Sequence, residues 1–326
     1  MHRRIHDSNF YNMDCISGAR KHVPDESVDL IITDPPYGIA GDELDTHYNR
    51  KESFVVDGYV EIPGEEYGDF SLRWIKEAER ILRPGGQIYL VSGYTNLHHV
   101  LTALRETDLY EVNHIIWKYN FGVYTRKKYV SSHYHILYWA RPGSERVFNL
   151  DCRYGPQERD ADGRSLNYRD REDVWIINRE YKPGRAKNKN ELPEKLLTKM
   201  IQYSSNEGDL VCDLFMGGFS TARVAIGLGR RFVGFEIAEP IFDHGVKSLA
   251  GVRPGGLLDS LRRPRTQTPE NQGQRWTEEE INLLLQRYGS LRQEGLLKKE
   301  AVAELGREFG RGRFSIERII RENWTG

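Results

Sequence analysis

Residues 28–37 read Val-Asp-Leu-Ile-Ile-Thr-Asp-Pro-Pro-Tyr, a short apolar run that stops at an acid and two prolines. A run of this length predicts a buried β-strand, and a residue that precedes proline disfavours helical backbone. The two prolines fix their own φ angles, so the loop after the strand is rigid. This stretch therefore predicts a buried strand that ends in a preorganised loop carrying the Asp34 carboxylate.

Strands and helices alternate along the chain after this stretch. Apolar spacing and Gly/Pro punctuation predict a helix at 70–82, a strand at 88–91, a helix at 95–106, strands at 114–117 and 131–139, a helix at 194–203, a strand at 210–214, a helix at 220–228 and a strand at 232–237. Such alternation with short connections indicates a Rossmann-like α/β fold with a mostly parallel, doubly wound sheet.

Changes in composition divide the 326 residues into parts. We expect a main domain over 1–251, in which 143–190 is a polar, irregular surface insert. Residues 252–274 are rich in Arg, Pro and Gly, which predicts a basic flexible linker. Residues 275–326 contain three helical patterns and predict a small all-α domain.

The overall composition bears on whether the protein binds nucleic acid, a metal or a membrane. The formal net charge is −1 and 38% of the residues are hydrophobic, so a surface for nucleic acid must come from local clusters of charge. The three cysteines are far apart, which excludes the usual zinc spacing, and we expect no metal. No run of 18 apolar residues occurs, so we expect a cytoplasmic protein that does not bind a membrane.

The loop Asp34-Pro35-Pro36-Tyr37 offers the groups that methylation of an exocyclic amine requires. Such an amine is a poor nucleophile because its lone pair is delocalised into the ring. The Asp34 carboxylate and the Pro35 carbonyl can accept hydrogen bonds from the NH2 group, which favours its nucleophilic form. Pro36 keeps the loop rigid, and Tyr37 offers a face on which an extruded base can stack, a contribution of roughly 1–3 kcal/mol.

A second motif covers residues 211–221, Val-Cys-Asp-Leu-Phe-Met-Gly-Gly-Phe-Ser-Thr. The expected strand ends there at a Gly turn and a helix begins, so backbone N–H groups at the start of the helix face a ligand. A Gly-Gly turn alone could be a tight connection, but it follows an Asp-Pro-Pro-Tyr loop in the same chain. The combination of the two motifs is therefore more specific than either motif.

Together the motifs resemble the amino-methyltransferase family of DNA enzymes, in which D/N/S-PP-Y/F closes a buried strand and D-PF-x-GSGT binds the cofactor. Leu214 and residues 218–220 depart from the second pattern. The catalytic loop precedes the cofactor loop, an order similar to that of the β-group of the family, and the resemblance covers approximately residues 8–250. It implies S-adenosylmethionine as cofactor and double-stranded DNA with a flipped target base as substrate.

The resemblance also implies the residues of the site. Asp34, Pro35, Pro36 and Tyr37 would be catalytic, in a direct SN2 transfer without a covalent intermediate. The cofactor-binding residues would be Asp14, Cys15, Asn190, Asp213, Phe215, Gly217, Gly218, Ser220, Thr221 and Glu236. Of these, Asp14 would lie near the cofactor adenine, and Glu236 follows the Gly turn by about 20 residues, where Rossmann-like sites hold ribose hydroxyls.

Two regions are candidates for DNA contact. Basic residues follow three aromatic residues, a mixture that suits phosphates and bases, although a solvated loop is the alternative. The basic residues are Arg126, Lys127 and Lys128, and the aromatic residues are Tyr119, Phe121 and Tyr124. By analogy with the family, the insert 143–190 would read the target sequence.

The C-terminal residues resemble a Myb/SANT-type or other helix-turn-helix domain, because Trp276-Thr277-x-Glu279-Glu280 precedes a helical pattern. Five of its arginines could face DNA phosphates, namely Arg307, Arg311, Arg313, Arg318 and Arg321. Nearby glutamates make a protein partner the alternative. The sequence also leaves open a homodimer and a paired restriction enzyme.

The sequence leaves several functions to compare. Methylation of adenine N6 is the favoured hypothesis, because the loop begins with Asp34 and not with Ser. Methylation of cytosine N4 is the alternative that uses the same loop chemistry. Methylation of RNA or of a protein glutamine fits less well, because the motif order differs. A DNA-binding protein with weak or no activity is the alternative of another class. Nothing in the sequence supports methylation of cytosine C5, since that chemistry needs a nucleophilic thiolate, which in its family follows a proline, and no cysteine here follows one.

Overall fold

The structure is a computed structural model that describes residues 1–38, 62–120, 122, 126–180, 191–262, 271 and 274–324. The chain divides into two compact units, Met1–Pro264 and Arg265–Gly326. Within the described ranges, no helix is both long enough and apolar enough to cross a membrane.

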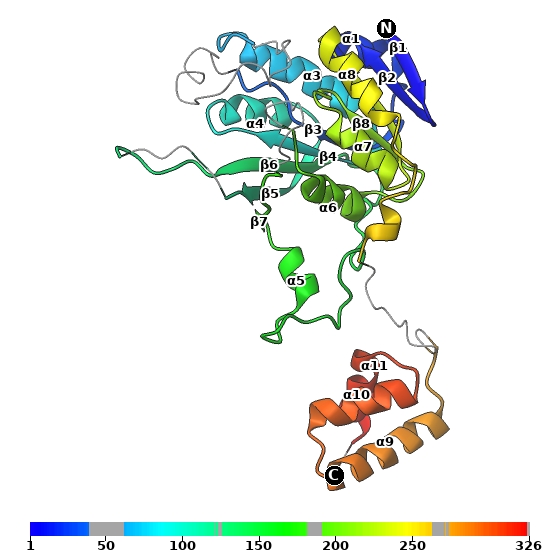
Figure 1. The fold of residues 1–326 in the computed structure, drawn as a ribbon. Coiled ribbons are helices and arrows are strands. Elements are labelled where there is room, and N and C mark those ends of the chain that lie inside the picture. Colours follow the sequence, from blue (N-terminus) through cyan, green and yellow to red (C-terminus); the bar gives the residue numbers. More distant parts are fainter. Residues whose placement is uncertain are drawn as a thin grey trace. The chain divides into compact units, whose positions relative to one another are not determined.

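The described part of the first unit is built on one nine-stranded sheet with the order β1-β2-β9-β8-β3-β4-β6-β5-β7 (Figure 1). The strands are β1 His2–Ile5, β2 Ser8–Asn12, β3 Val28–Thr33, β4 Leu82–Ser92, β5 Tyr110–Lys118, β6 His133–Ala140, β7 Val174–Ile176, β8 Leu210–Asp213 and β9 Arg231–Glu236. The run from β2 to β4 is parallel. Strand β6 is antiparallel to both β4 and β5, and β1 is antiparallel to β2.

Helices cover both faces of this sheet (Figure 1). They are α1 Cys15–His22, α3 Tyr67–Ile81, α4 Leu97–Arg105, α6 Glu194–Ser204, α7 Ser220–Gly227 and α8 Glu239–Leu249. The short helix α5, Leu166–Asp170, lies on the connection before β7 and away from the sheet. Successive residues of β3 point to opposite faces. Ile31 belongs to the core formed with α1, α3 and α4, whereas Leu30 and Ile32 belong to the core formed with α6, α7 and α8. Strand β3 is therefore buried on both faces, as its apolar run predicts.

Three parts of the first unit differ from the sequence prediction. The N-terminal residues form the β1–β2 hairpin, which their polar sequence does not reveal. The insert is not only surface, because β7 pairs with β5 and Trp175 is 7% exposed; three residues are too few to show an alternating pattern. Residues 252–262 are not a free linker, since Leu257 and Leu258 pack on the core and the Leu257 N–H donates to the Gly227 carbonyl at 2.8 Å.

The second unit contains three helices in its described part: α9 Glu278–Gln293, α10 Lys298–Glu308 and α11 Arg313–Asn323. Thr277 and Glu280 form a capping box at the start of α9. Arg311, expected to face DNA, is instead 3% exposed: it donates to the carbonyls of Asn271 and Gln274 and lies 4.5 Å from the centroid of the Trp276 ring. Arg311 therefore holds the unit together from inside.

Candidate active site

The two sequence motifs meet at one edge of the sheet. Strands β3 and β8 are parallel neighbours, so the loops that leave their carboxyl ends lie side by side. The Thr33 hydroxyl at the end of β3 donates to the Asp213 carboxylate at the end of β8, with an Oγ1–Oδ1 distance of 2.9 Å. Open α/β sheets bind ligands at this edge. The predicted catalytic loop and the predicted cofactor loop therefore share one site.

Within the catalytic loop, the acid and the aromatic residue are joined directly. The Tyr37 hydroxyl donates to Oδ1 of Asp34 at 2.6 Å. Burial raises the pKa of Asp34 to about 7; the hydrogen bond from Tyr37 and the nearby Arg179 guanidinium oppose this rise, while the Asp213 charge adds to it. The pKa of Tyr37 is raised well above its usual value, first by burial and then by the charge of Asp34, so Tyr37 stays a hydrogen-bond donor.

Side chains from two helices hold the same loop. Tyr67, the first residue of α3, donates from its hydroxyl to the Pro36 carbonyl at 2.9 Å. Asn96, which immediately precedes α4, donates from Nδ2 to the carbonyls of Tyr37 at 2.7 Å and Gly38 at 3.1 Å. The sequence motifs did not indicate these two residues, because they lie outside the loop and reach it only through the fold.

An aromatic cluster borders the catalytic loop. The ring of Tyr37 lies 5.7 Å from that of Tyr134 on β6, and Tyr134 in turn lies 5.7 Å from Trp117 and 5.4 Å from Tyr119. The Arg179 guanidinium lies 5.1–5.8 Å from the ring centroids of Trp117, Tyr119 and Tyr134. Aromatic faces beside a carboxylate suit a planar, hydrogen-bonding ligand such as a base. Neither Tyr134 nor Arg179 was predicted for this site from the sequence.

Five predicted cofactor residues are brought together where β8 and β9 end. Burial raises the pKa of Asp213 to about 6, opposed by hydrogen bonds from the Thr221 side chain, the Phe215 N–H and Thr33. The Phe215 N–H donates to Oδ1 of Asp213 at 3.0 Å. Glu236 accepts from the Gly217 N–H at 2.9 Å and from the Ala238 N–H at 2.8 Å. Both carboxylates are thus fixed by the backbone that surrounds them.

The departures from the family pattern have a structural consequence. Phe219 has φ +62°, in the left-handed region, at a position where the family pattern has Gly. Its ring is fully buried and packs on Phe10 and Phe242, which holds the residue in this conformation. A Cβ at Gly218 would meet the Glu191 side chain, which would have to shift. Ser220 and Thr221 begin α7 and are buried; Asn190 lies outside the described residues.

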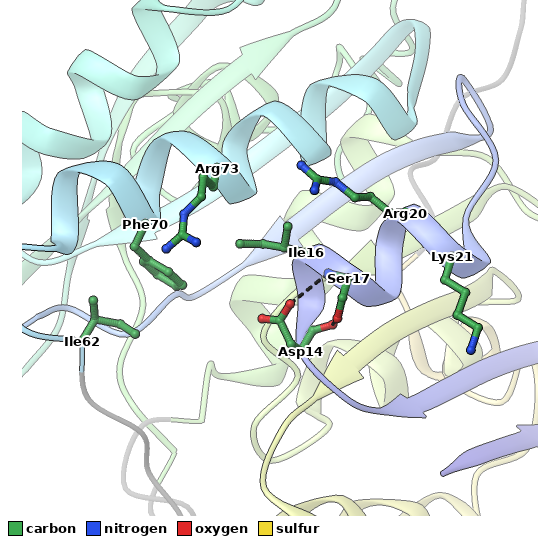
Figure 2. Close-up of a pocket in the computed structure, with 8 residues that line it drawn as sticks. All are labelled: Asp14, Ile16, Ser17, Arg20, Lys21, Ile62, Phe70 and Arg73. Carbon is green, nitrogen blue, oxygen red and sulfur yellow. Dashed lines mark hydrogen bonds between the residues drawn. The ribbon is translucent and has the colours of Figure 1, made fainter.

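Asp14 and Cys15 lie at the carboxyl end of β2, next to β9. The Met13 N–H donates to the Glu236 carbonyl at 3.1 Å, and Asp14 caps α1 by accepting from the Ser17 N–H at 2.9 Å. Asp14 lines a pocket of about 600 Å³. Figure 2 shows this pocket between α1 and α3, with Phe70 and Arg73 opposite Asp14. The Phe70 ring lies 5.9 Å from that of Phe215.

This pocket therefore adjoins the cofactor loop through Phe70, a residue that the sequence motifs did not indicate. Cys15 itself is 5% exposed, and burial, followed by the charge of Asp14, raises the pKa of its thiol above its usual range. The Cys15 side chain is thus a small packing group, whereas Asp14 is one of the polar residues that line the pocket.

The predicted DNA-binding residues lie on the connection between β5 and β6. Arg126, Lys127 and Lys128 are exposed, whereas Tyr119 is buried in the aromatic cluster. Phe121 and Tyr124 lie outside the described residues. The aromatic and basic residues therefore do not form one surface among the described residues: Tyr119 borders the catalytic loop, and the three cations face solvent.

A family model described as DNA methylase, covering N6 and N4 enzymes, matches residues 28–247. The chain belongs to this DNA methylase family. The type II methyltransferase M.BamHI of Bacillus amyloliquefaciens is 32% identical over 243 residues, which cover 70% of this chain and 54% of M.BamHI. M.HpaI of Haemophilus parainfluenzae is 30% identical over 222 residues, which cover 67% of each protein. The chain thus matches about half the length of M.BamHI.

Solved structures show that the methylase has the fold predicted from its sequence. The complex of M1.HpyAVI with S-adenosylmethionine superposes with a TM-score of 0.51 at 21% identity, covering 74% of this chain and 98% of that one. PvuII DNA methyltransferase, which is cytosine-N4-specific, superposes with a TM-score of 0.56 at 16% identity, covering 79% and 94%. The prediction of a Rossmann-like methyltransferase fold with a mostly parallel sheet is confirmed.

Proposed function

We propose that this DNA methylase transfers a methyl group from S-adenosylmethionine to an exocyclic amino group of a base in double-stranded DNA, with adenine N6 as the target. The hydrogen-bonded pair Asp34–Tyr37, beside the loop that follows Asp213, is the observation that supports this proposal most strongly. A carboxylate and an aromatic ring on a rigid loop suit a flipped base, and the neighbouring loop suits the methyl donor.

The cofactor residues fit S-adenosylmethionine by their chemistry. Glu236 offers a carboxylate for a ribose diol, and its two oxygens have more lone pairs than the backbone N–H contacts use. Asp14 offers a carboxylate for the amino group of the cofactor adenine, and Phe215 offers a ring. Gly217 leaves the backbone open to a close ligand. When bound, the cofactor supplies a methyl group on a sulfonium, which is strongly electrophilic.

The residues of the catalytic loop orient and activate the amine. Asp34, when ionised, accepts a hydrogen bond from the NH2 group, and the Pro35 carbonyl accepts another, so the nitrogen lone pair is directed toward the methyl carbon. The N–C bond forms as the S–C bond breaks, and the sulfur keeps the electron pair. Asp34, with a pKa of about 7, can take the proton that the nitrogen then loses. Proximity and orientation supply most of the acceleration.

The target base is either adenine or cytosine, since both carry an exocyclic amino group. Asp34 at the first position of the loop favours adenine over cytosine. Cytosine N4 is the alternative, because PvuII methyltransferase has this fold and is cytosine-N4-specific. A DNA-binding protein without activity is less well supported, since such a protein would not need the hydrogen bond between Tyr37 and Asp34.

The remaining assignments belong to the same proposal. The β-group motif order is supported by the position of β3 before β8 in the chain and beside it in the sheet. We assign target recognition to the insert 143–190 and phosphate contact to Arg126, Lys127 and Lys128. The second unit would bind DNA through α11 or would bind a protein partner, as a Myb/SANT-like domain. A cytoplasmic location and a homodimer complete the proposal.

The experiment that tests the proposal is a methylation assay on unmethylated duplex DNA. The wild-type protein should transfer a labelled methyl group from S-adenosylmethionine to DNA. Asp34→Ala should abolish the transfer and keep the affinity for S-adenosylmethionine and DNA, whereas Asp7→Ala, an exposed acid paired with Arg4, should have no effect. If the wild-type protein binds DNA but transfers nothing, the DNA-binding function replaces the enzyme.

A further inference from the structure

We infer that Asn96 is a positioning residue for methyl transfer, which holds the catalytic loop so that Asp34 and the Pro35 carbonyl face the amine. The inference rests on the proposed function. It extends that function to a residue outside both sequence motifs, on the connection between β4 and α4.

The contacts of Asn96 account for both hydrogens of its amide. One is donated to the Tyr37 carbonyl at 2.7 Å and the other to the Gly38 carbonyl at 3.1 Å. Gly38 has φ +65°, and a Cβ there would lie 2.5 Å from the Tyr67 ring and 2.9 Å from Nδ2 of Asn96. The close approach of the amide to the loop therefore depends on Gly38, and the backbone conformation of the loop end depends on the amide.

Asn96 makes these contacts instead of capping its own helix. It is the N-cap residue of α4, and Asn is one of the residues most favoured there, yet its side chain makes no capping hydrogen bond. The Asp, Ser and Thr residues at N-cap positions of the described helices do cap: Asp14 caps α1, Ser165 caps α5 and Thr277 caps α9. The Asn96 side chain therefore bonds the catalytic loop and leaves the start of α4 without a side-chain cap.

Three carbonyls of the loop accept hydrogen bonds from the protein, and the Pro35 carbonyl is the one proposed to accept from the substrate. Tyr67 donates a hydrogen bond to the Pro36 carbonyl, and Asn96 donates to the carbonyls of Tyr37 and Gly38. Among the described residues, none donates a hydrogen bond to the Pro35 carbonyl. Holding three successive carbonyls fixes the direction of the preceding one, which is the acceptor that the proposed mechanism needs.

The substitution Asn96→Asp separates positioning from stability. An aspartate has the same shape and is an equally good N-cap, but it cannot donate to two carbonyls, and its charge repels them. We expect the rate of methyl transfer in a single turnover to fall by roughly 100-fold, as misplacement of reacting groups by about 1 Å does. The melting temperature should stay the same or rise, and the dissociation constant for S-adenosylmethionine should stay within about twofold of wild type.

Controls make each outcome decisive. Asn9→Asp makes the same chemical change on β2, at an exposed contact with His2, and should leave the rate unchanged. Asn96→Ser, which can also cap α4 but is too short to hold both carbonyls, should behave like Asn96→Asp. A normal rate in Asn96→Asp overturns the inference, and so does a loss of rate that is matched by a loss of melting temperature. If the wild-type protein methylates no DNA, the proposed function fails and the inference, which rests on it, is overturned with it.

Discussion

Replacing Tyr37 with Phe tests the link between the aromatic residue and the acid. The substitution keeps the ring for base stacking and removes the hydroxyl, which donates to Asp34 at 2.6 Å. A hydrogen bond to the charged form of an acid lowers its pKa, so removal of the hydroxyl raises the pKa of Asp34. Since the mechanism needs Asp34 ionised, the acid limb of the pH–rate profile should move to higher pH.

The size of this effect follows from the bond and from its surroundings. A hydrogen bond to an ionised group contributes about 1.5–3 kcal/mol, and 1.36 kcal/mol corresponds to one pKa unit. The apparent pKa should therefore rise from about 7 in the wild type to roughly 8–9, nearer 8 because the loop is half-buried and water can replace the hydroxyl. At pH 7 the rate should fall by roughly 5- to 50-fold and should recover at higher pH.

The assay is methyl transfer in a single turnover, because release of product limits many steady-state rates. Rates are measured from pH 5.5 to 9.5 at saturating DNA and S-adenosylmethionine, together with the melting temperature at each pH. An acid limb that stays at the wild-type pH refutes the reasoning. So does a loss of rate that is the same at every pH, because the hydroxyl would then act on something other than the ionisation of Asp34.

Three further predictions concern the rest of the molecule. Glu236→Gln should weaken binding of S-adenosylmethionine about tenfold in calorimetry, since a hydrogen bond to an ionised group is lost, while the exposed Glu239→Gln should not; equal affinities would remove Glu236 from the cofactor site. Phe219→Gly should lower the free energy of unfolding by about 2–4 kcal/mol in urea titrations, because the cavity left by a buried ring outweighs relief of the left-handed backbone; a more stable variant would contradict this. Replacing Arg126, Lys127 and Lys128 with glutamine should make the DNA-binding constant less dependent on salt concentration, by an amount that corresponds to up to about three phosphate contacts. An unchanged salt dependence would show that these residues lie on a solvated loop.

The central part of the fold could be predicted from the sequence because its signals are local. The apolar run of β3 is buried on both faces, and the strand and helix around the Gly turn lie within two residues of the expected bounds. Strand β7 could not be predicted, because its three residues join the sheet only by pairing with β5, far away in the chain. The leucines at 257 and 258 were likewise hidden among Arg, Pro and Gly, although they pack on the core.

The candidate site also contains residues that the sequence predicts and residues that only the fold reveals. Asp34, Tyr37, Asp213 and Glu236 belong to motifs whose spacing is visible in the sequence, and the structure brings them to one edge of the sheet. Asn96 reaches the loop from the start of another helix, and its sequence context, Tyr-Thr-Asn-Leu, is that of an ordinary helix cap. Side chains that act on backbone carbonyls distant in sequence leave no pattern, so only the fold reveals them.

The most direct test of the central claim is mass spectrometry of nucleosides from unmethylated duplex DNA that has been incubated with the protein and S-adenosylmethionine. We expect N6-methyladenine, absent when Asp34 is replaced by alanine. N4-methylcytosine would keep the mechanism and overturn the choice of base, whereas DNA that is bound but carries no methylated amine would contradict the claim that this site is a DNA amino-methyltransferase.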